Sequence, residues 1–252
     1  MPAVLTFEPH PREFFGETDL PRISTLRDKL ANIVACGIQR VFVMPFNEAM
    51  AKTAPAEFAR DILAEGLACR WVSVGENFTF GAGRSGNFAT LEELGQHYHF
   101  ETFKTPLLFH GQERISSSRI RAALALGDLH EAAEMLGRAV AMTGRVVHGA
   151  ALGRQLGFPT LAVRVKGLDA IGSVWPGVAS IGNKPTVVSD GRWLLETHVF
   201  NWTGNAYGKL IEVEFVEKLR DEKKFSGLPE LTAAISADCE RAKAILGVKV
   251  QA

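Results

Sequence analysis

The first hundred residues alternate short apolar runs with stretches in which apolar residues recur every three or four positions. The runs at 3–7, 41–43 and 71–74 predict strands. Helical spacing lies between and after them, at Leu26, Leu30 and Ile33, at Phe58, Ile62 and Leu63, and at Leu91 and Leu94. Because strands that alternate with helices are joined by crossovers, this half is expected to form a parallel sheet covered by helices.

A well-marked helix is expected near residue 130. The apolar residues from Leu129 to Leu136 fall on one helical face. Asp128 and Glu131 are placed as a capping box, and Gly137 provides the stop.

Beyond this helix the period becomes that of strands. Apolar residues alternate with polar or charged ones at 195–199 and at 211–215, which predicts antiparallel β structure. A last helix is expected to begin near Pro229, since proline suits the first helical turn. We therefore predict two domains, an α/β domain at 1–137 and a β domain at 138–252.

Composition and charge exclude some classes of partner. With 252 residues and 46% hydrophobic content, the chain can bury a core in each of two domains. Lysine plus arginine and aspartate plus glutamate both total 28, so no excess of positive charge is available for a nucleic-acid backbone. No apolar run approaches the roughly 20 residues of a membrane span. Neither a nucleic-acid partner nor a membrane is expected.

The three cysteines are widely spaced and lack any paired metal-ligand spacing. Buried, reduced thiols are therefore expected at Cys36, Cys69 and Cys239, and the cytoplasm is the compartment that fits.

The first domain carries a candidate nucleotide site in two segments. His10 follows the first predicted strand in a proline-rich turn, where it could meet a phosphate or a flavin tail, although a histidine in such a turn is more often structural. Ser116, Ser117 and Ser118 precede an apolar helical stretch, with Arg121 close behind. Their hydroxyls and the first-turn amides could hold a phosphate, or one serine could simply cap the helix.

The β domain carries a second candidate site. Residues 144–160 include four glycines and two arginines and end in Pro159 and Thr160. Such a loop could cradle ATP phosphates while the Thr160 hydroxyl reaches Mg²⁺, or it could be a plain connection between strands. Glu196 shares a strand face with His198, where a carboxylate could accept a hydroxyl proton, although most strand glutamates are merely solvated.

In their order along the chain, these segments resemble bacterial bifunctional riboflavin kinase and FMN adenylyltransferase, the FAD synthetase family. The motifs that carry the resemblance over essentially the whole chain are TFEPHP (6–11), GENFTFG (75–81), ISSSRIR (115–121), GRQLGFPT (153–160), IGNKPT (181–186), LETHVF (195–200), AYGK (206–209) and LRDEKKF (219–225). Eight matches in the same order are not expected by chance.

The resemblance implies a Rossmann-like nucleotidyltransferase domain, which adenylylates FMN. A six-stranded antiparallel β-barrel riboflavin kinase domain with a C-terminal helix would follow, and would phosphorylate riboflavin. ATP would be the co-substrate, FMN and FAD the products, and Mg²⁺ the metal. Among the matching positions, Glu196 would be the catalytic base, and Thr160 would bind the metal and an ATP phosphate. The other binding residues implied are Gly149, Gly153, Gly157, Pro159 and Asn183 in the kinase domain, Arg220 in its flavin-side flap, His10 in the cleft of the first domain, and Ser116, Ser117, Ser118 and Arg121 on ATP phosphates.

The sequence departs from the family pattern at two main places. The family's first strand and its His-x-Gly-His signature are not found ahead of Ala3, so the sheet is expected to lack its first strand. The family's Pro-Thr-x-Asn motif has Ala162 where the metal-binding asparagine is expected, and we expect a loop to be missing between Leu161 and Ala162. Smaller departures are Asn77 for aspartate and Ser118 for threonine.

The leading hypothesis is an enzyme that phosphorylates riboflavin to FMN and adenylylates FMN to FAD. Two alternatives stay open: a catalytically impaired flavin- or nucleotide-binding remnant of such an enzyme, and a related nucleotidyltransferase with another substrate.

Overall fold

The computed structural model describes residues 1–16, 21–148, 160–169, 172–183, 193–221, 223 and 225–248. The chain folds as two compact units. The first consists of Met1–Arg22 and Lys29–Ile115, and the second of Ile23–Asp28 and Ser116–Ala252. A short segment of the first half thus belongs to the second unit, and the predicted boundary after residue 137 stays a prediction.

The first unit alternates strands and helices as predicted. Its strands are β1 (Ala3–Glu8), β2 (Arg40–Pro45), β3 (Trp71–Val74), β4 (Glu101–Lys104), β5 (Phe109–His110) and β6 (Glu113–Arg114). Its helical segments are α1 (Pro11–Phe14), α2 (Leu26–Ala35, which begins in the second unit), α3 (Glu48–Lys52), α4 (Pro55–Glu57), the π-helical η1 (Phe58–Gly66), the 3₁₀ turn η2 (Ala82–Arg84) and α5 (Phe88–Tyr98). The three strands and three helices predicted in this half are confirmed.

The first four strands of this unit pair in parallel, which confirms the predicted direction, whereas β5 and β6 form a short antiparallel pair. β1 pairs with β2, and β3 pairs with β4. No ladder joins one pair to the other within the residues that the structure describes. Both pairs nevertheless contribute to one core, because Phe7 of β1 and Val74 of β3 pack against a cluster that includes Phe58 and Leu91.

The second unit begins with two helices and continues as a sheet. Its elements are α6 (Ser117–Leu126), α7 (Leu129–Leu136), β7 (Ala141–Arg145), β8 (Thr160–Lys166), β9 (Val174–Asn183), β10 (Trp193–Val199), β11 (Leu210–Arg220) and α8 (Leu228–Leu246). The helix expected near residue 130 is confirmed as α7. The Asp128 side chain accepts the Glu131 N–H at 2.9 Å, and Gly137 ends the helix with a left-handed φ of 65°. The last helix begins one residue before Pro229, close to the prediction.

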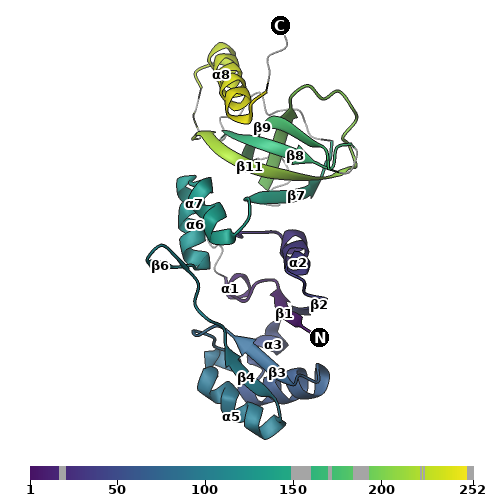
Figure 1. The fold of residues 1–252 in the computed structure, drawn as a ribbon, viewed down its shortest axis with the longest axis vertical. Helices are drawn as coiled ribbons and strands as arrows, with labels where there is room; N and C mark the ends of the chain where they lie inside the picture. Colours follow the sequence, from purple (N-terminus) through teal and green to yellow (C-terminus); the bar gives the residue numbers. More distant parts are fainter. Residues whose placement is uncertain are drawn as a thin grey trace. The chain divides into compact units, whose positions relative to one another are not determined.

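The predicted antiparallel structure is confirmed. Within the described residues it is a five-stranded sheet in the order β10-β9-β8-β11-β7 (Figure 1). β8 runs through Leu161 and Ala162 without a break and pairs residue by residue with β9. The strand is thus continuous here, and the loop expected to be missing between these two residues stays a prediction.

The two faces of the sheet have different roles. Side chains alternate along a strand, and Val163 and Val165 of β8, both fully buried, lie on the face opposite to Ala162. Ala162 lies on the face that α8 covers (Figure 1), in a cluster with Phe200 and with Ala242 of the helix. α8 thus closes over the outer face of β8, β9 and β11.

Two further predictions concern membrane-spanning helices and the cysteines. None of the described helices combines the length and the apolar character that a membrane-spanning helix needs. The three thiols are free, and burial raises the pKa of Cys69 and Cys239. Cys36 is exposed, so the expectation of a buried thiol is wrong at that position.

Candidate active site in the second unit

Four polar side chains form one row across the sheet. Arg220 of β11 pairs with Thr160 of β8, Thr160 pairs with Ser180 of β9, and Ser180 pairs with Glu196 of β10. Directly opposed residues of antiparallel strands project to the same face. The register therefore places all four side chains on the face that α8 covers.

An irregularity in β11 brings Arg220 into this row. Lys218 pairs with Leu161 and Arg220 pairs with Thr160, so Leu219 has no partner on β8. A β-bulge of this kind turns the side chains that follow it. Leu219 is buried with Ala162 in the cluster under α8. Because of the bulge, Arg220 can face the same side of the sheet as Leu219, although the two residues are neighbours in the chain.

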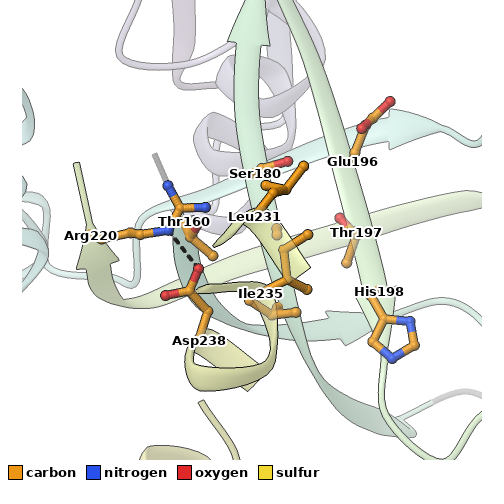
Figure 2. A pocket seen from close by; sticks show the side chains of 11 residues that line it. Thr160, Ser180, Glu196, Thr197, His198, Arg220, Leu231, Ile235 and Asp238 are labelled. Atoms are coloured by element: carbon orange, nitrogen blue, oxygen red, sulfur yellow. Dashed lines mark hydrogen bonds and ion pairs between the residues drawn. The ribbon is translucent and has the colours of Figure 1, made fainter. Parts of the chain in front are cut away.

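The row forms the floor of a cavity of about 220 Å³. The described residues that line it are Thr160, Val178, Ala179, Ser180, Glu196, Thr197, His198, Arg220, Leu231, Ile235 and Asp238. Figure 2 shows Thr160 and Arg220 at one side of the pocket and Glu196 and His198 at the other. The cavity is smaller than the roughly 300 Å³ from which ligand pockets usually start. It suits a phosphoryl group and the end of a substrate rather than a whole nucleotide.

Helix α8 supplies the opposite wall of the pocket. Leu231 and Ile235 line the pocket one helical turn apart, and Asp238 follows at the next turn. The Asp238 carboxylate accepts a hydrogen bond from Nε of Arg220 at 2.6 Å (Figure 2). The Arg220 guanidinium also lies 5.3 Å from the centre of the Phe225 ring, which is within cation–π range.

Thr160 and Glu196 face the same pocket but are two strands apart. With neighbouring strands about 4.8 Å apart, their Cα atoms are separated by about 10 Å. Thr160 is buried at 6% exposure, whereas Glu196 is partly exposed. The Glu196 carboxylate points away from Thr160 in Figure 2. The two side chains can therefore meet different parts of one ligand.

Ala162 cannot replace the asparagine that the family motif has at this position. Its side chain is fully buried and packs on Ala242 of α8, so it offers neither an oxygen nor access to the pocket. No group of three or more histidine, cysteine, aspartate or glutamate side chains that could hold a metal occurs among the described residues. Among the described residues that line the pocket, the side chains with an oxygen for a cation are Thr160, Ser180, Thr197 and the two carboxylates.

Five of the implied binding residues lie wholly or partly outside the described residues. Gly149, Gly153, Gly157 and Pro159 lie outside the described residues. Asn183 ends β9, but only its backbone is described. The role of the glycine-rich loop therefore stays a prediction.

His10 caps a helix in the first unit. Its Nδ1 accepts the Arg12 N–H at 3.2 Å, at the start of α1. With Nδ1 used as an acceptor, a neutral His10 carries its proton on Nε2. The histidine thus has a structural role in the turn, and its expected contact with a flavin tail or a nucleotide stays a prediction.

The serine cluster lies at the start of α6, in the second unit. Ser116 is the N-cap, and its hydroxyl accepts the Arg119 N–H at 3.2 Å. Arg119 in turn forms an ion pair with Glu131 of α7 at 2.5 Å. One serine is therefore used as a cap, while Ser117 and Ser118 are exposed in the first turn. The exposed serines and the half-buried Arg121 are compatible both with a phosphate site and with a plain helix cap.

Several pocket residues were missed by sequence reasoning. Ser180 lies between Thr160 and Glu196, and only the strand register reveals this. Asp238 was one acidic residue among several on a predicted helix. Its spacing from Leu231 and Ile235, which puts it on their helix face, was the one signal available.

Comparison with known proteins identifies both halves of the chain. The sequence model of the family described as FAD synthetase matches residues 1–119, and that described as riboflavin kinase matches residues 136–246. The bifunctional riboflavin kinase/FMN adenylyltransferase of Pseudomonas fluorescens is 37% identical, over 96% of this chain and 82% of the relative. The enzyme of the same name from Escherichia coli K12 is 38% identical, over 97% of this chain and 82% of the relative.

This chain belongs to the bifunctional riboflavin kinase/FMN adenylyltransferase family. The resemblance inferred from the motifs is thereby confirmed. The E. coli alignment spans 259 positions, more than the 252 residues of this chain. That relative therefore holds residues, inside the aligned range, that this family member lacks.

A solved structure shares the fold of this family member. A protein described as a macrolide-efflux protein from Streptococcus pneumoniae superposes with a TM-score of 0.70, over 94% of this chain and 81% of that one. The two sequences are 23% identical. At that identity the likeness concerns the fold alone.

Proposed function

We propose that this protein phosphorylates riboflavin to FMN with ATP and then adenylylates FMN with a second ATP to give FAD. Two family matches, one in each half, support the proposal, as do relatives named for both activities at 37–38% identity over nearly the whole chain. The observation that carries the kinase half is the polar row from Arg220 to Glu196 across one pocket.

The chemistry of phosphoryl transfer fits the two sides of this pocket. Positioning and electrostatic stabilisation do most of the work, because charge spreads over the oxygens of the transferred group. Arg220 and the buried Thr160 hydroxyl form a side suited to those oxygens. Glu196, on the other side, is a carboxylate that can orient the riboflavin 5′-hydroxyl and accept its proton.

Mg²⁺ would be held in part by the nucleotide itself. The ion usually keeps several waters and takes one or two protein oxygens besides substrate phosphates. Thr160 Oγ1 is the protein ligand that we propose, and Ala162 contributes none. The residues present fit an ion that arrives with ATP, and its part would be to neutralise phosphate charge.

We also propose the finer details of the fold. The two parallel pairs β1–β2 and β3–β4, with one shared core, are what a Rossmann-like sheet without its middle strand would leave. The five described antiparallel strands are compatible with a six-stranded barrel. In the second unit, we propose that Ser116, the exposed Ser117 and Ser118, and Arg121 meet the phosphates of a nucleotide. In the first unit, we propose that His10 meets a flavin tail or a nucleotide.

One incubation tests both activities. The purified protein is mixed with riboflavin, ATP and Mg²⁺, and the flavins are separated by chromatography. FMN supports the kinase, and FAD in addition supports the adenylyltransferase. If neither forms although riboflavin still protects the protein from thermal unfolding, the chain is a flavin-binding remnant instead. Protection by ATP but not by any flavin would indicate a nucleotidyltransferase with another substrate.

A further inference from the structure

The second unit buries a carboxylate that is not among the residues implied by the family motifs. Asp238, on the α8 wall of the pocket, is 8% exposed. An aspartate is rarely this buried unless it is paired, because removing a charge from water is costly. Its partner is Arg220, at 2.6 Å.

We infer that Asp238 is a positioning residue for phosphoryl transfer, acting by holding the Arg220 guanidinium at the Thr160 side of the pocket. The inference rests on the proposed kinase function and goes beyond it. Asp238 reaches the reaction through Arg220 and is not itself a catalytic residue.

The geometry around the guanidinium supports this role. Arg220 is the last residue of β11 and follows the bulge at Leu219, where a strand end by itself would leave a long side chain free to turn. Asp238 engages Nε, and the Phe225 ring lies 5.3 Å from the guanidinium carbon. A carboxylate on a 19-residue helix is a rigid anchor, so the orientation of the guanidinium depends on α8.

The distribution of charge explains why the position of Arg220 matters. Among the described residues that line the pocket, Arg220 is the one arginine or lysine, beside two carboxylates. A cation assists phosphoryl transfer most when it already points at the site where negative charge develops. Removal of Asp238 also removes a negative charge, which by itself would favour an anionic ligand. A lower turnover in such a variant would therefore come from lost positioning and not from weaker attraction.

The same two elements provide a matched control. Arg241 of α8 pairs with Glu217 of β11 at 2.8 Å. Neither residue lines the pocket. Glu217→Gln thus removes a carboxylate from a second β11–α8 ion pair without touching the proposed site.

A double-mutant cycle on FMN formation tests the inference. We expect Asp238→Ala to lower kcat about tenfold and to change the riboflavin KM less than twofold. The control variant Glu217→Gln should keep the kcat and the KM of the wild type. In an Arg220→Met background, Asp238→Ala should lower kcat no further. Should Asp238→Ala fail to fold, Asp238→Leu replaces it in the cycle, because leucine keeps the size of the side chain and offers no acceptor oxygen to Arg220.

Two results would overturn the inference. One is a wild-type kcat in the folded Asp238 variants, and the other is an equal loss with and without Arg220. A wild-type protein that makes no FMN would instead contradict the proposed kinase function. Failure of the kinase proposal is therefore seen in the wild type, and failure of the positioning inference is seen in the variants.

Discussion

Single residues of the pocket carry distinct chemistry although they share one face of a sheet. Thr160 is buried and Glu196 partly exposed, so a hydroxyl and a carboxylate are offered to different parts of a ligand. Ala162, in contrast, is buried against α8 and therefore offers nothing to a ligand in the pocket. Two sequence motifs name these three positions, but the accessibility of each side chain depends on the neighbouring elements.

Replacement of Glu196 tests the proposed base. Glu196→Gln keeps the size of the side chain and removes its ability to accept a proton, and a general base typically contributes a factor of about 10²–10⁴. We expect kcat for FMN formation to fall about 100-fold or more, with KM values and the thermal midpoint nearly unchanged. Glu212→Gln serves as the control, because Glu212 pairs with Lys166 on the sheet and does not line the pocket. Unchanged turnover in Glu196→Gln would remove this residue from the mechanism.

The elements bring the polar row together by close packing of strands. Gly177 of β9 shows how close β9 and β10 lie. A Cβ at this position would come within 2.6 Å of the His198 carbonyl oxygen, which belongs to the strand that carries Glu196. Glycine is thus required there by space, and the approach of the two strands sets the spacing between Ser180 and Glu196.

Substitution at Gly177 should therefore disturb the sheet and the site together. We expect Gly177→Ala to lower the free energy of unfolding by about 1–3 kcal/mol, as overpacked cores do, and to lower FMN formation as well. Gly144→Ala is the matched control, since Gly144 also lies in a strand and a Cβ added there would meet nothing within 4 Å. Urea unfolding of both variants measures the difference. Equal stability of the two would mean that β10 can shift without cost.

The segment between β11 and α8 has its own pH dependence. The Ser226 N–H, Lys223 and the Ser226 hydroxyl together lower the pKa of Glu230 from 4.5 to about 2. A carboxylate whose pKa is lower in the folded protein stabilises it fully above pH 4.5, and this stability is lost as the pH falls towards 2. The side chains are exposed, so the effect is small.

Glu230→Gln isolates this contribution. We expect its thermal midpoint to lie below that of the wild type at pH 7, and the gap to narrow as the pH falls below about 4.5. Thermal unfolding of both proteins between pH 7 and pH 3.5 checks it. A gap that stays constant across this range would show that Glu230 is not linked to stability through its charge.

At the scale of the whole molecule, the second unit is larger than the stretch after residue 137. α7 packs on β11 and buries Leu129, Ala132 and Met135. In addition, Asp28 is 8% exposed and accepts the Thr143 N–H of β7 at 3.2 Å. The unit therefore depends on residues from well before the predicted boundary.

Two pieces of the chain test where the second domain begins. We expect residues 116–252 to be more stable than residues 138–252, because each large apolar side chain that α7 buries contributes about 1.5–3 kcal/mol. The stabilities of the two pieces are compared by denaturant unfolding and by resistance to proteolysis. Equal stability would favour the boundary after residue 137.

The sequence by itself determined the elements and the family. The spacing of apolar residues located β1, β3, α7 and β11, because that spacing follows directly from which face is buried, and Pro229 marked the start of α8. Ordered motifs led to the family, since they are read along the chain without any knowledge of its path.

Only the tertiary structure decided which residues share the pocket. Ser180 and Asp238 come from a strand and a helix 58 residues apart in the chain, and they meet the same cavity through strand register, a bulge in β11 and the packing of α8. The same packing covers Ala162 with α8 and so keeps it out of the pocket. Such contacts depend on how elements distant in sequence approach one another, and local patterns of hydrophobicity carry no information about that.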